Sequence, residues 1–403
     1  MKQKKVWGLI LVASLGYFVD IYDLIIFNVV KKKSLADLGF VGEAFKQQEI
    51  TLFNLQMIGM LLGGLLWGVM GDKRGRISVL FGSIILYSLA NLANAFVTSI
   101  EMYGLCRFIA GLGLAGELGA GITLVSETMP KEKRGYGTMI IVTVGALGAV
   151  AASVIGKTDW KTAYIIGGVM GLALLLLRAG TFESGMFQSA KKAEVKKGDF
   201  FQLFSTRKIF FKYLNCILIG LPVWFVIGIL IALAERFANV IQITNGTVKV
   251  GECVMFAYLG LSFGDLISGL LSQYLKSRKK VVIIYLTSCM ILVLVYVFSN
   301  NISLEMFHLL CFSLGAATGY WALFVTIASE QFGTNLRSTV TNTVPNFVRG
   351  AVVPITLSFS FLEKSFHTPV TAALIVGVVC ILLALSAVLS VEETFSKDLD
   401  YFE

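Results

Sequence analysis

Residues 126–138 read SETMPKEKRGYGT, and residues 329–341 read SEQFGTNLRSTVT. When the chain is shifted by 203 positions, four identical residues coincide: Ser126 with Ser329, Glu127 with Glu330, Arg134 with Arg337, and Thr138 with Thr341. Upstream, Gly116 meets Gly319 and Thr123 meets Thr326. The match indicates an internal repeat, and therefore a chain built from two similar halves that run parallel.

The composition around this repeat is that of a membrane protein. The chain has 403 residues, of which 56% are hydrophobic and only 15% are charged, and its mean hydropathy is +0.79. A soluble chain of this length would hold more charge and divide into two or three domains. We therefore expect an all-α protein that crosses the bilayer many times.

Twelve apolar segments are near the length of about 20 residues that a bilayer-spanning helix requires. They cover residues 7–30, 50–70, 77–97, 102–126, 136–156, 162–178, 210–234, 249–273, 281–299, 304–328, 340–362 and 370–391. The longest polar interruption, 179–209, divides them six and six. We predict two pseudo-symmetric six-helix bundles, residues 1–180 and 210–403 with a short tail, joined by a cytoplasmic linker at 181–209.

The distribution of basic residues predicts the orientation. With both termini in the cytoplasm, cytoplasmic segments hold 23 of the 34 Lys and Arg residues and outer segments hold 9. Lys31, Lys32 and Lys33 on the outer side oppose this assignment. The expected location is the inner membrane, and the net charge of +9 is mostly a signal of topology. Nucleic-acid binding would need a soluble basic face, which the sequence does not offer.

A basic, glycine-rich stretch, GVMGDKRGR at 68–76, lies between the second and third segments. Its glycines permit a tight turn, and Asp72 can face the N-terminus of a neighbouring helix. Arg74 and Arg76 can bind carboxylates such as Asp72 or Glu127 in a bidentate manner. The alternative is an ordinary basic loop that follows the positive-inside rule.

This stretch resembles the signature loop of the major facilitator superfamily. RFIAGLGLAGELGAG at 107–121 and SETMPKEKRG at 126–135 resemble that family's elements in the fourth helix and at its end. The resemblance covers the whole chain, and DIYDLIIF at 20–27 is most similar to the metabolite:proton and phosphate:proton symporter branches. It implies alternating access, with a conformational latch formed by Gly68, Asp72, Arg74, Arg76, Glu127 and Arg134 and, in the second half, by Glu330 and Arg337. One departure is Gln273, where the second copy of the loop would hold an acid.

Two acids, Asp20 and Asp23, lie inside the apolar 7–30 segment. A charge at a helix centre costs about 2.5–3.5 kcal/mol on insertion scales, so such acids usually face a bundle interior or a wet cavity. Helical spacing places them in one arc of about 140° with Tyr17, Phe27 and Asn28. Asp20 and Asp23 are candidates for proton coupling, together with Glu117 in a later segment, and Tyr17 and Asn28 are candidates for solute binding. Alternatively, Asp20 and Asp23 neutralise Arg107 or Arg349 as structural pairs.

Other segments add polar residues at similar depth. In the 102–126 segment the resemblance gives Glu117 an acidic symporter position and gives Arg107 a bracing role, with solute binding as the alternative. Asn342, Asn346 and Arg349 share one helical face, and the arginine can clamp an anion. The remaining candidates are Tyr320 and Trp321, as solute contacts or packing aromatics, and Asp265, as a structural pair or a proton site.

We therefore expect a secondary transporter that imports a small polar solute with protons. The central arginine favours an anionic or zwitterionic solute: an organic acid, a carboxylate chelate or siderophore, phosphate or an amino acid. The alternatives are a proton-coupled multidrug or metabolite exporter and a non-transporting receptor. The sequence has no P-loop, catalytic triad or metal-ligand cluster, so we expect no enzyme activity, no cofactor and no metal. The partners expected are the solute, protons and lipid, with no nucleic acid and a monomeric protein.

Overall fold

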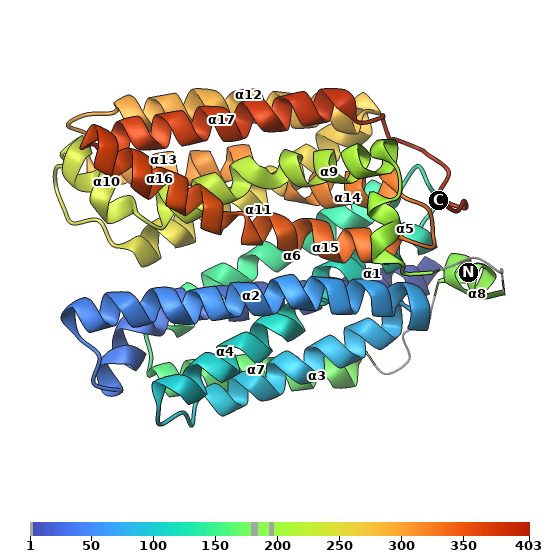
Figure 1. Ribbon diagram of the computed structural model, residues 1–403, viewed down its shortest axis with the longest axis horizontal. Helices are drawn as coiled ribbons and strands as arrows, with labels where there is room; N and C mark the ends of the chain where they lie inside the picture. Colours follow the sequence, from blue (N-terminus) through green and yellow to red (C-terminus); the bar gives the residue numbers. More distant parts are fainter. Residues whose placement is uncertain (1–2, 179–183, 193–196) are drawn as a thin grey trace.

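Two bundles of helices lie side by side in the computed structural model, which describes residues 3–178, 184–192 and 197–403. Figure 1 shows α2, α3, α4 and α7 in the lower bundle and α9, α12, α13, α16 and α17 in the upper one, with both termini at the same end. We call this the terminal end. The predicted all-α architecture of two six-helix bundles is confirmed.

The first bundle begins with two helices that are longer than a bilayer requires. Its helices are α1 (Gln3–Asp37), α2 (Gly42–Arg74), α3 (Arg76–Asn94), α4 (Ile100–Leu114), α5 (Glu117–Thr128), α6 (Arg134–Ile155) and α7 (Trp160–Leu177). The turn from α2 into α3 depends on Gly75, whose φ of 104° is rarely adopted by residues with a side chain. The predicted linker 181–209 contains helix α8 (Gly185–Lys192) and the 3₁₀ turn η1 (Phe200–Phe204). Positions 181–183 and 193–196 of that linker lie outside the described residues.

The second bundle begins with α9 (Arg207–Phe225), which continues through a π-helical turn, η2 (Val226–Ile231). Pro222 inside α9 removes one backbone donor just before this turn, which explains the local change in the hydrogen-bonding pattern. The remaining helices are α10 (Ala234–Ile241), α11 (Val250–Leu275), α12 (Arg278–Phe298), α13 (Leu304–Thr318), α14 (Trp321–Gln331), α15 (Arg337–Gly350), α16 (Val352–Phe366) and α17 (Pro369–Ser390).

The internal repeat is also seen in the positions at which these helices begin and end. The fourth span is broken between α4 and α5 at Gly116, and the tenth is broken between α13 and α14 at Gly319, which is 203 positions later. Helices α6 and α15 begin at the matching residues Arg134 and Arg337. The two halves are therefore similar in backbone as well as in sequence.

Eleven helices in the described part of the chain are long and apolar enough to cross a membrane. The twelfth span consists of α15 and α16, which are interrupted at Ala351, and α15 contains Asn342, Asn346 and Arg349. Large apolar side chains are exposed on the outside of both bundles, including Leu66, Val154, Leu357 and Phe361. Such a surface fits lipid rather than water.

The two bundles meet along two pairs of helices, α2 with α15 and α6 with α11. Glycines permit the close approach. A Cβ at Gly64 would lie 3.1 Å from the Asn342 carbonyl, and a Cβ at Gly269 would lie 2.4 Å from the Met139 side chain. Hydrogen bonds also join the bundles. For example, Ser262 Oγ donates to the Thr143 carbonyl at 2.7 Å. The site described below lies between these two contact lines.

Candidate functional site

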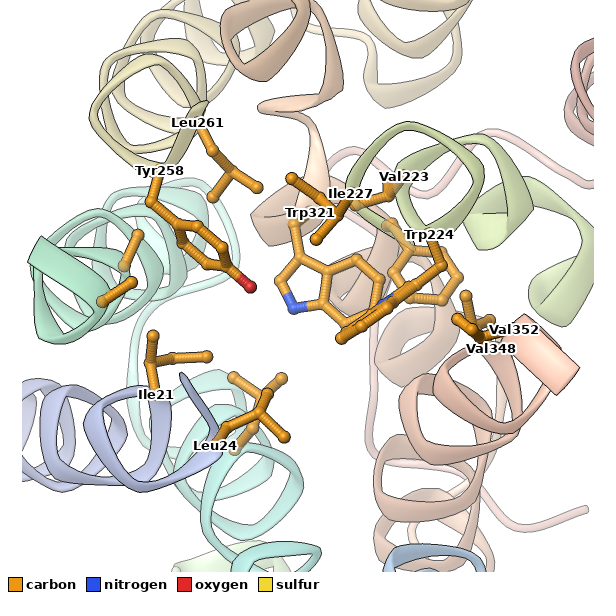
Figure 2. Close-up of a cluster of buried hydrophobic side chains, with 14 of the residues drawn as sticks. Ile21, Leu24, Val223, Trp224, Ile227, Tyr258, Leu261, Trp321, Val348 and Val352 are labelled. Carbon is orange, nitrogen blue, oxygen red and sulfur yellow. The ribbon is translucent and has the colours of Figure 1, made fainter. Parts of the chain in front are cut away.

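A small cavity lies between the bundles and is lined by residues from both (Figure 2). Its free volume of about 20 Å³ is room for roughly one water molecule. The first bundle contributes side chains from α1 and α6, and the second contributes side chains from α9, η2, α11, α14 and α15. The lining residues are Tyr17, Ile21, Ala146, Val223, Trp224, Ile227, Tyr258, Leu261, Trp321 and Arg349.

The repeat is visible around this cavity. Ile21 and Trp224 are 203 positions apart, and so are Ala146 and Arg349, and all four line the space. The two halves thus present equivalent positions to a shared centre, with small or aliphatic side chains from one half and a tryptophan and an arginine from the other. A wider groove of about 720 Å³ is lined by Lys32, Lys33 and neighbours, at the end away from the termini. It lies on the surface of the first bundle alone, so it offers no path between the bundles.

Arg349 supplies a positive charge to the cavity lining. It is buried near the end of α15, and its Nη1 donates to Asn346 Oδ1 at 3.1 Å. Its guanidinium lies 6.0 Å from the centre of the Trp321 ring. Asn346 also donates to the carbonyls of Ala115, across the bundle boundary at 3.0 Å, and of Asn342. The arginine is therefore held by an amide that is itself fixed to both bundles.

The rest of the cavity wall is largely aromatic. Figure 2 shows the hydroxyl of Tyr258 and the indole nitrogen of Trp321 directed toward the same space. Trp321 Nε1 is buried and has no hydrogen-bond partner among the described residues. The backbone of Trp321 begins helix α14, where the side chain of Asp265 accepts a hydrogen bond from the Ala322 N–H at 2.8 Å. Asp265 thus fixes the helix start that positions this indole.

Asp20 faces the cavity arginine from α1. Its Oδ2 lies 3.8 Å from Arg349 Nη2, which is an ion pair without a hydrogen bond. Neither carboxylate oxygen of Asp20 has a hydrogen-bond partner within the described chain, although the residue is fully buried. The pair is therefore loose, and either partner could be drawn away by a competing charge.

Asp23, about one turn along α1 from Asp20, lies inside the first bundle and approaches α7. A Cβ at Gly167 of α7 would lie 2.4 Å from Asp23 Oδ1. The nearby charge is Arg107, and Asn91 lies beside the carboxylate, although in a geometry too poor for a regular hydrogen bond. Arg107 donates to Gln56 and lies over the rings of Phe27 at 5.1 Å and Tyr164 at 5.8 Å. Neither Asp23 nor Arg107 lines the cavity.

Glu117 begins α5 and is bound by Arg178. Arg178 follows the last residue of α7, is fully buried, and also donates to the Leu80 carbonyl. From the sequence, Arg178 was counted only among the cytoplasmic basic residues that predict the orientation. Its position at the end of an apolar segment was a signal that it could turn inward toward a membrane acid.

The other residues predicted to contact the solute lie outside the cavity lining. Tyr320 donates to the Ile219 carbonyl at 2.9 Å within the second bundle. Asn342 donates to the Ser338 carbonyl at 2.8 Å, where α15 crosses α5. Asn28 is partly exposed. Of the predicted set, Tyr17, Trp321 and Arg349 line the cavity, while Trp224 and Tyr258 were not anticipated because aromatic residues in apolar helices give no distinctive pattern.

The predicted latch residues gather at the terminal end. Asp72 accepts hydrogen bonds from the backbone N–H groups of Ser338 at 3.0 Å and Thr339 at 2.8 Å, and from the Thr339 hydroxyl. It thus caps the first turn of α15 in the opposite bundle, where a negative charge is stabilised. Gly68 permits this approach, because a Cβ there would lie 2.9 Å from the Thr339 Cα. Arg74 is exposed.

Glu127 joins arginines from the two bundles. Its Oε1 accepts from Arg76 and from Arg337, each at 2.8 Å, and Ser184 donates to its other oxygen at 2.5 Å. All three charged groups are buried or nearly so. Because the acid and Arg76 belong to one bundle and Arg337 to the other, the network joins the two bundles at the terminal end.

The second half builds its counterpart differently. Glu330 accepts two hydrogen bonds of 3.1 Å from Arg278 and lies 3.8 Å from Arg134 of the first bundle. Gln273 lies against the start of α6, where a Cβ at Gly135 would be 2.0 Å from its amide nitrogen. A neutral amide thus occupies the place where the first half uses Asp72.

The last residues of the chain pack against this same end. Arg337 donates to the Leu399 carbonyl at 2.6 Å, and Arg134 donates to the Lys397 carbonyl at 3.0 Å. A backbone hydrogen bond from Asp400 lowers the pKa of the Asp398 carboxyl, with Lys131 and Arg134 nearby adding to the effect. The tail therefore connects an arginine of each bundle.

Residues 13–351 match the sequence profile of the family described as the Major Facilitator Superfamily. The chain belongs to this superfamily. It is therefore a multi-pass membrane transporter rather than an enzyme.

Two curated relatives and one solved structure illustrate the similarity. The sialic acid transporter of Escherichia coli is 25% identical over 362 residues, covering 86% of this chain and 85% of the relative. The benzoate transport protein of Acinetobacter baylyi is 29% identical over 205 residues, covering 47% and 42%. The structure of the proton:xylose symporter XylE bound to 6-bromo-6-deoxy-D-glucose superposes with a TM-score of 0.80 at 16% identity, covering 99% of this chain and 98% of XylE. At that identity the structure supports the fold alone.

Proposed function

We propose that the protein imports a small aromatic or heteroaromatic carboxylate together with a proton. The observation that supports this most directly is the single guanidinium, Arg349, in a cavity walled by Trp224, Trp321, Tyr17 and Tyr258. Arginine binds a carboxylate in a bidentate manner, and aromatic rings favour a flat apolar body. The cavity as it stands is too small for such a solute, so binding requires the walls to move apart.

The relatives point to the same chemistry. Benzoate and sialic acid, the solutes in the relatives' names, each have one carboxylate. They differ in the rest of the molecule, which is aromatic in one and a polyol in the other. The aromatic lining of this cavity favours the benzoate-like alternative over the sugar acid.

Coupling follows from the loose pair between Asp20 and Arg349. While Asp20 is ionised, it competes with the solute carboxylate for the guanidinium. When Asp20 takes up a proton, Arg349 is left without a counter-charge and binds the solute more strongly. Proton and solute therefore stabilise each other's binding, which is the thermodynamic requirement for symport.

We further propose that the two bundles, residues 1–180 and 210–403, rock about the cavity with the linker 181–209 between them. The terminal end faces the cytoplasm, as the excess of basic residues there predicts. The contacts that Asp72, Glu127 and Glu330 make between the bundles at that end support a latch that keeps it closed. The alternate state would break these contacts and separate α2 from α15.

The first test is uptake by proteoliposomes with and without an inside-alkaline pH gradient. The solutes are benzoate, nicotinate, 4-hydroxybenzoate and N-acetylneuraminate, with benzamide as the uncharged match for benzoate. We expect gradient-driven accumulation of the aromatic acids and none of benzamide. Accumulation that ignores the gradient would contradict coupling, and equal uptake of benzamide would contradict recognition by Arg349.

The second test is Asp20→Asn, which removes the proton site while keeping the side-chain volume. We expect loss of gradient-driven benzoate accumulation, with exchange of benzoate across the membrane retained because Arg349 no longer has a competitor. Uptake of labelled benzoate would measure accumulation, and counterflow of labelled benzoate would measure exchange. If Asp20→Asn accumulates benzoate as the wild type does, the coupling role belongs to another residue.

A further inference from the structure

Helix α3 presents a row of polar side chains to the interior of the first bundle. All of them are fully buried, and each has at least one polar atom without a hydrogen-bond partner in the described chain. They follow helical spacing, so they form one continuous line, which we call the α3 polar row. Its members are Ser83, Tyr87, Ser88, Asn91 and Asn94.

These groups require partners. Leaving a buried amide or hydroxyl unbonded costs about 1–3 kcal/mol each, so such groups in proteins are normally satisfied by protein or by ordered water. Among the described residues, neither the oxygen nor the nitrogen of the Asn91 and Asn94 side chains has a regular hydrogen-bond partner, although Asn91 lies beside Asp23. A row of unpaired donors and acceptors is the surface that buried water molecules bind.

The α3 polar row is close to Asp23, the acid of α1 that does not line the solute cavity. Asn91 is beside Asp23, and neither oxygen of Asp23 has a regular hydrogen bond among the described residues. On the other side of Asp23, glycines of α7 allow that helix to pack closely. A Cβ at Gly167 would lie 2.4 Å from Asp23, and one at Gly171 would lie 2.0 Å from Ser88 Oγ. Asp23 is thus close to Asn91 of α3 and to the backbone of α7.

The row also connects different depths in the membrane. Helix α3 begins at Arg76 at the terminal end and finishes at Asn94 at the opposite end. From Ser83 to Asn94 the helix rises about 16 Å, roughly half the thickness of the hydrocarbon core. Tyr87, in the middle, lies within electrostatic reach of Glu117, Asp23 and Asp20.

The charge balance favours protons over a metal cation as the mobile species. Each of the three acids has an arginine as its neighbouring positive charge. Asp20 faces Arg349, Asp23 faces Arg107, and Glu117 is bound by Arg178. A sodium ion added to this interior would face three arginines. Water can hold a proton transiently without a fixed site of excess negative charge.

We propose that water bound at Asn91 and Asn94, the part of the α3 polar row farthest from the termini, conducts protons between the end opposite the termini and Asp23, by a route inside the first bundle that is separate from the solute cavity. Each water accepts one proton and releases another, and the carboxylate of Asp23 becomes a carboxyl group, with no electron transfer. Asp23 then exchanges its proton with Asp20, which faces Arg349. The route rests on the proposed symport, and it gives a role to the second acid of α1.

The test replaces both amides by isosteric apolar side chains in the full-length protein, as Asn91→Leu with Asn94→Leu. Proton influx driven by benzoate is followed with a pH-sensitive dye trapped in proteoliposomes, beside benzoate counterflow, which needs no net proton movement. We expect proton influx to fall at least tenfold while counterflow stays within twofold. The matched control is Asn215→Leu, a partly buried amide on α9, which should leave both rates unchanged.

A second variant guards against misfolding. Asn91→Ser with Asn94→Ser keeps the groups polar and leaves space for water, so it should restore proton influx to within threefold of the wild type. A structural role for the amides would instead lower counterflow and the unfolding temperature in both double variants. Normal proton influx in the leucine variant, or loss of counterflow together with influx, would overturn the route.

A readout without solute separates this inference from the proposed function. Infrared difference spectroscopy after a pH jump follows protonation of membrane carboxyls, and Asp23→Asn identifies the band of Asp23. The leucine variant should slow the appearance of that band at least tenfold. If it does while the wild type shows no benzoate-driven proton influx, the route stands and symport of benzoate falls. If the rate is unchanged, the route falls whatever the transport assays show.

Discussion

Arg349 illustrates how far single residues could be read from the sequence. Its spacing from Asn342 and Asn346 indicated a polar face directed inward, and in the structure Arg349 does line the cavity. The amides turned out to hold the arginine and the backbone instead of lining the cavity themselves. Helical spacing identifies a shared face, but a face of α15 is wide enough to meet both a cavity and a neighbouring helix.

Substitution of Arg349 should separate charge from geometry. Arg349→Lys keeps the charge but loses the planar fork, so we expect the KM for benzoate uptake to rise about 10- to 100-fold, the equivalent of one charged hydrogen bond. Arg349→Gln should abolish uptake. The control is Arg236→Lys, because Arg236 is 60% exposed and forms only a surface pair with Glu363. An unchanged KM for Arg349→Lys would show that the solute does not contact this side chain.

Arg178 shows why some site residues could not be found. A basic residue at the end of an apolar segment normally reaches to the membrane surface, and counting it toward the topology was reasonable. It turns inward because Glu117, 61 positions earlier, begins α5 at the same depth. Such a pairing depends on how α5 and α7 are placed, which local patterns do not contain. Trp224 and Tyr258 were not predicted as cavity residues for a similar reason, since in an apolar helix the sequence does not distinguish the face that lines a cavity from the other faces.

At the scale of helices, the twelve segments were predictable because length and hydropathy decide a membrane span. The breaks inside them were harder to locate. The fourth and tenth spans are interrupted at Gly116 and Gly319 without a proline, within continuous apolar sequence. The repeat matched these two glycines but gave no indication that the helix stops there. What interrupts the tenth span is tertiary, since Asp265 of α11 caps the new start of α14.

Helix contacts made through glycine predict a clear stability difference. A Cβ at Gly260 of α11 would lie 1.9 Å from the Phe312 carbonyl of α13, whereas Gly251 on the same helix has no atom within 4 Å. We expect Gly260→Ala to force the helices apart and lower the unfolding temperature in detergent by several degrees. Gly251→Ala should leave it unchanged or raise it slightly, because alanine favours a helix. Equal unfolding temperatures, followed by tryptophan fluorescence, would contradict the close packing of α11 on α13.

For the whole molecule, the terminal end is closed by charges that belong to different bundles. Glu127 holds Arg76 and Arg337 together, and breaking such a buried pair costs about 3–5 kcal/mol. That is close to the difference of about 5.5 kcal/mol that reverses a two-state population. We therefore expect the loss of the Glu127 carboxylate to shift the balance between the two states measurably.

Glu127→Gln should shift the protein toward the state that is open at the terminal end. The backbone N–H groups of Ser338 and Thr339, now bound to Asp72, should exchange with deuterium faster, while peptides at the opposite end exchange more slowly or as before. Mass spectrometry of the exchanged peptides measures both. The control is Glu363→Gln, which breaks only the exposed pair with Arg236. Unaltered exchange around residues 334–341 in Glu127→Gln would show that this network does not govern opening.

The six cysteines offer a practical advantage for observing these movements. Cys106, Cys216, Cys253, Cys289, Cys311 and Cys380 are all unpaired and buried, and they are the full complement of the chain. Thiol-reactive dyes therefore have little native background to modify. Fluorophores attached to cysteines introduced at exposed sites such as Val41 and Asn300 could report opening in single molecules without first replacing every native sulfur.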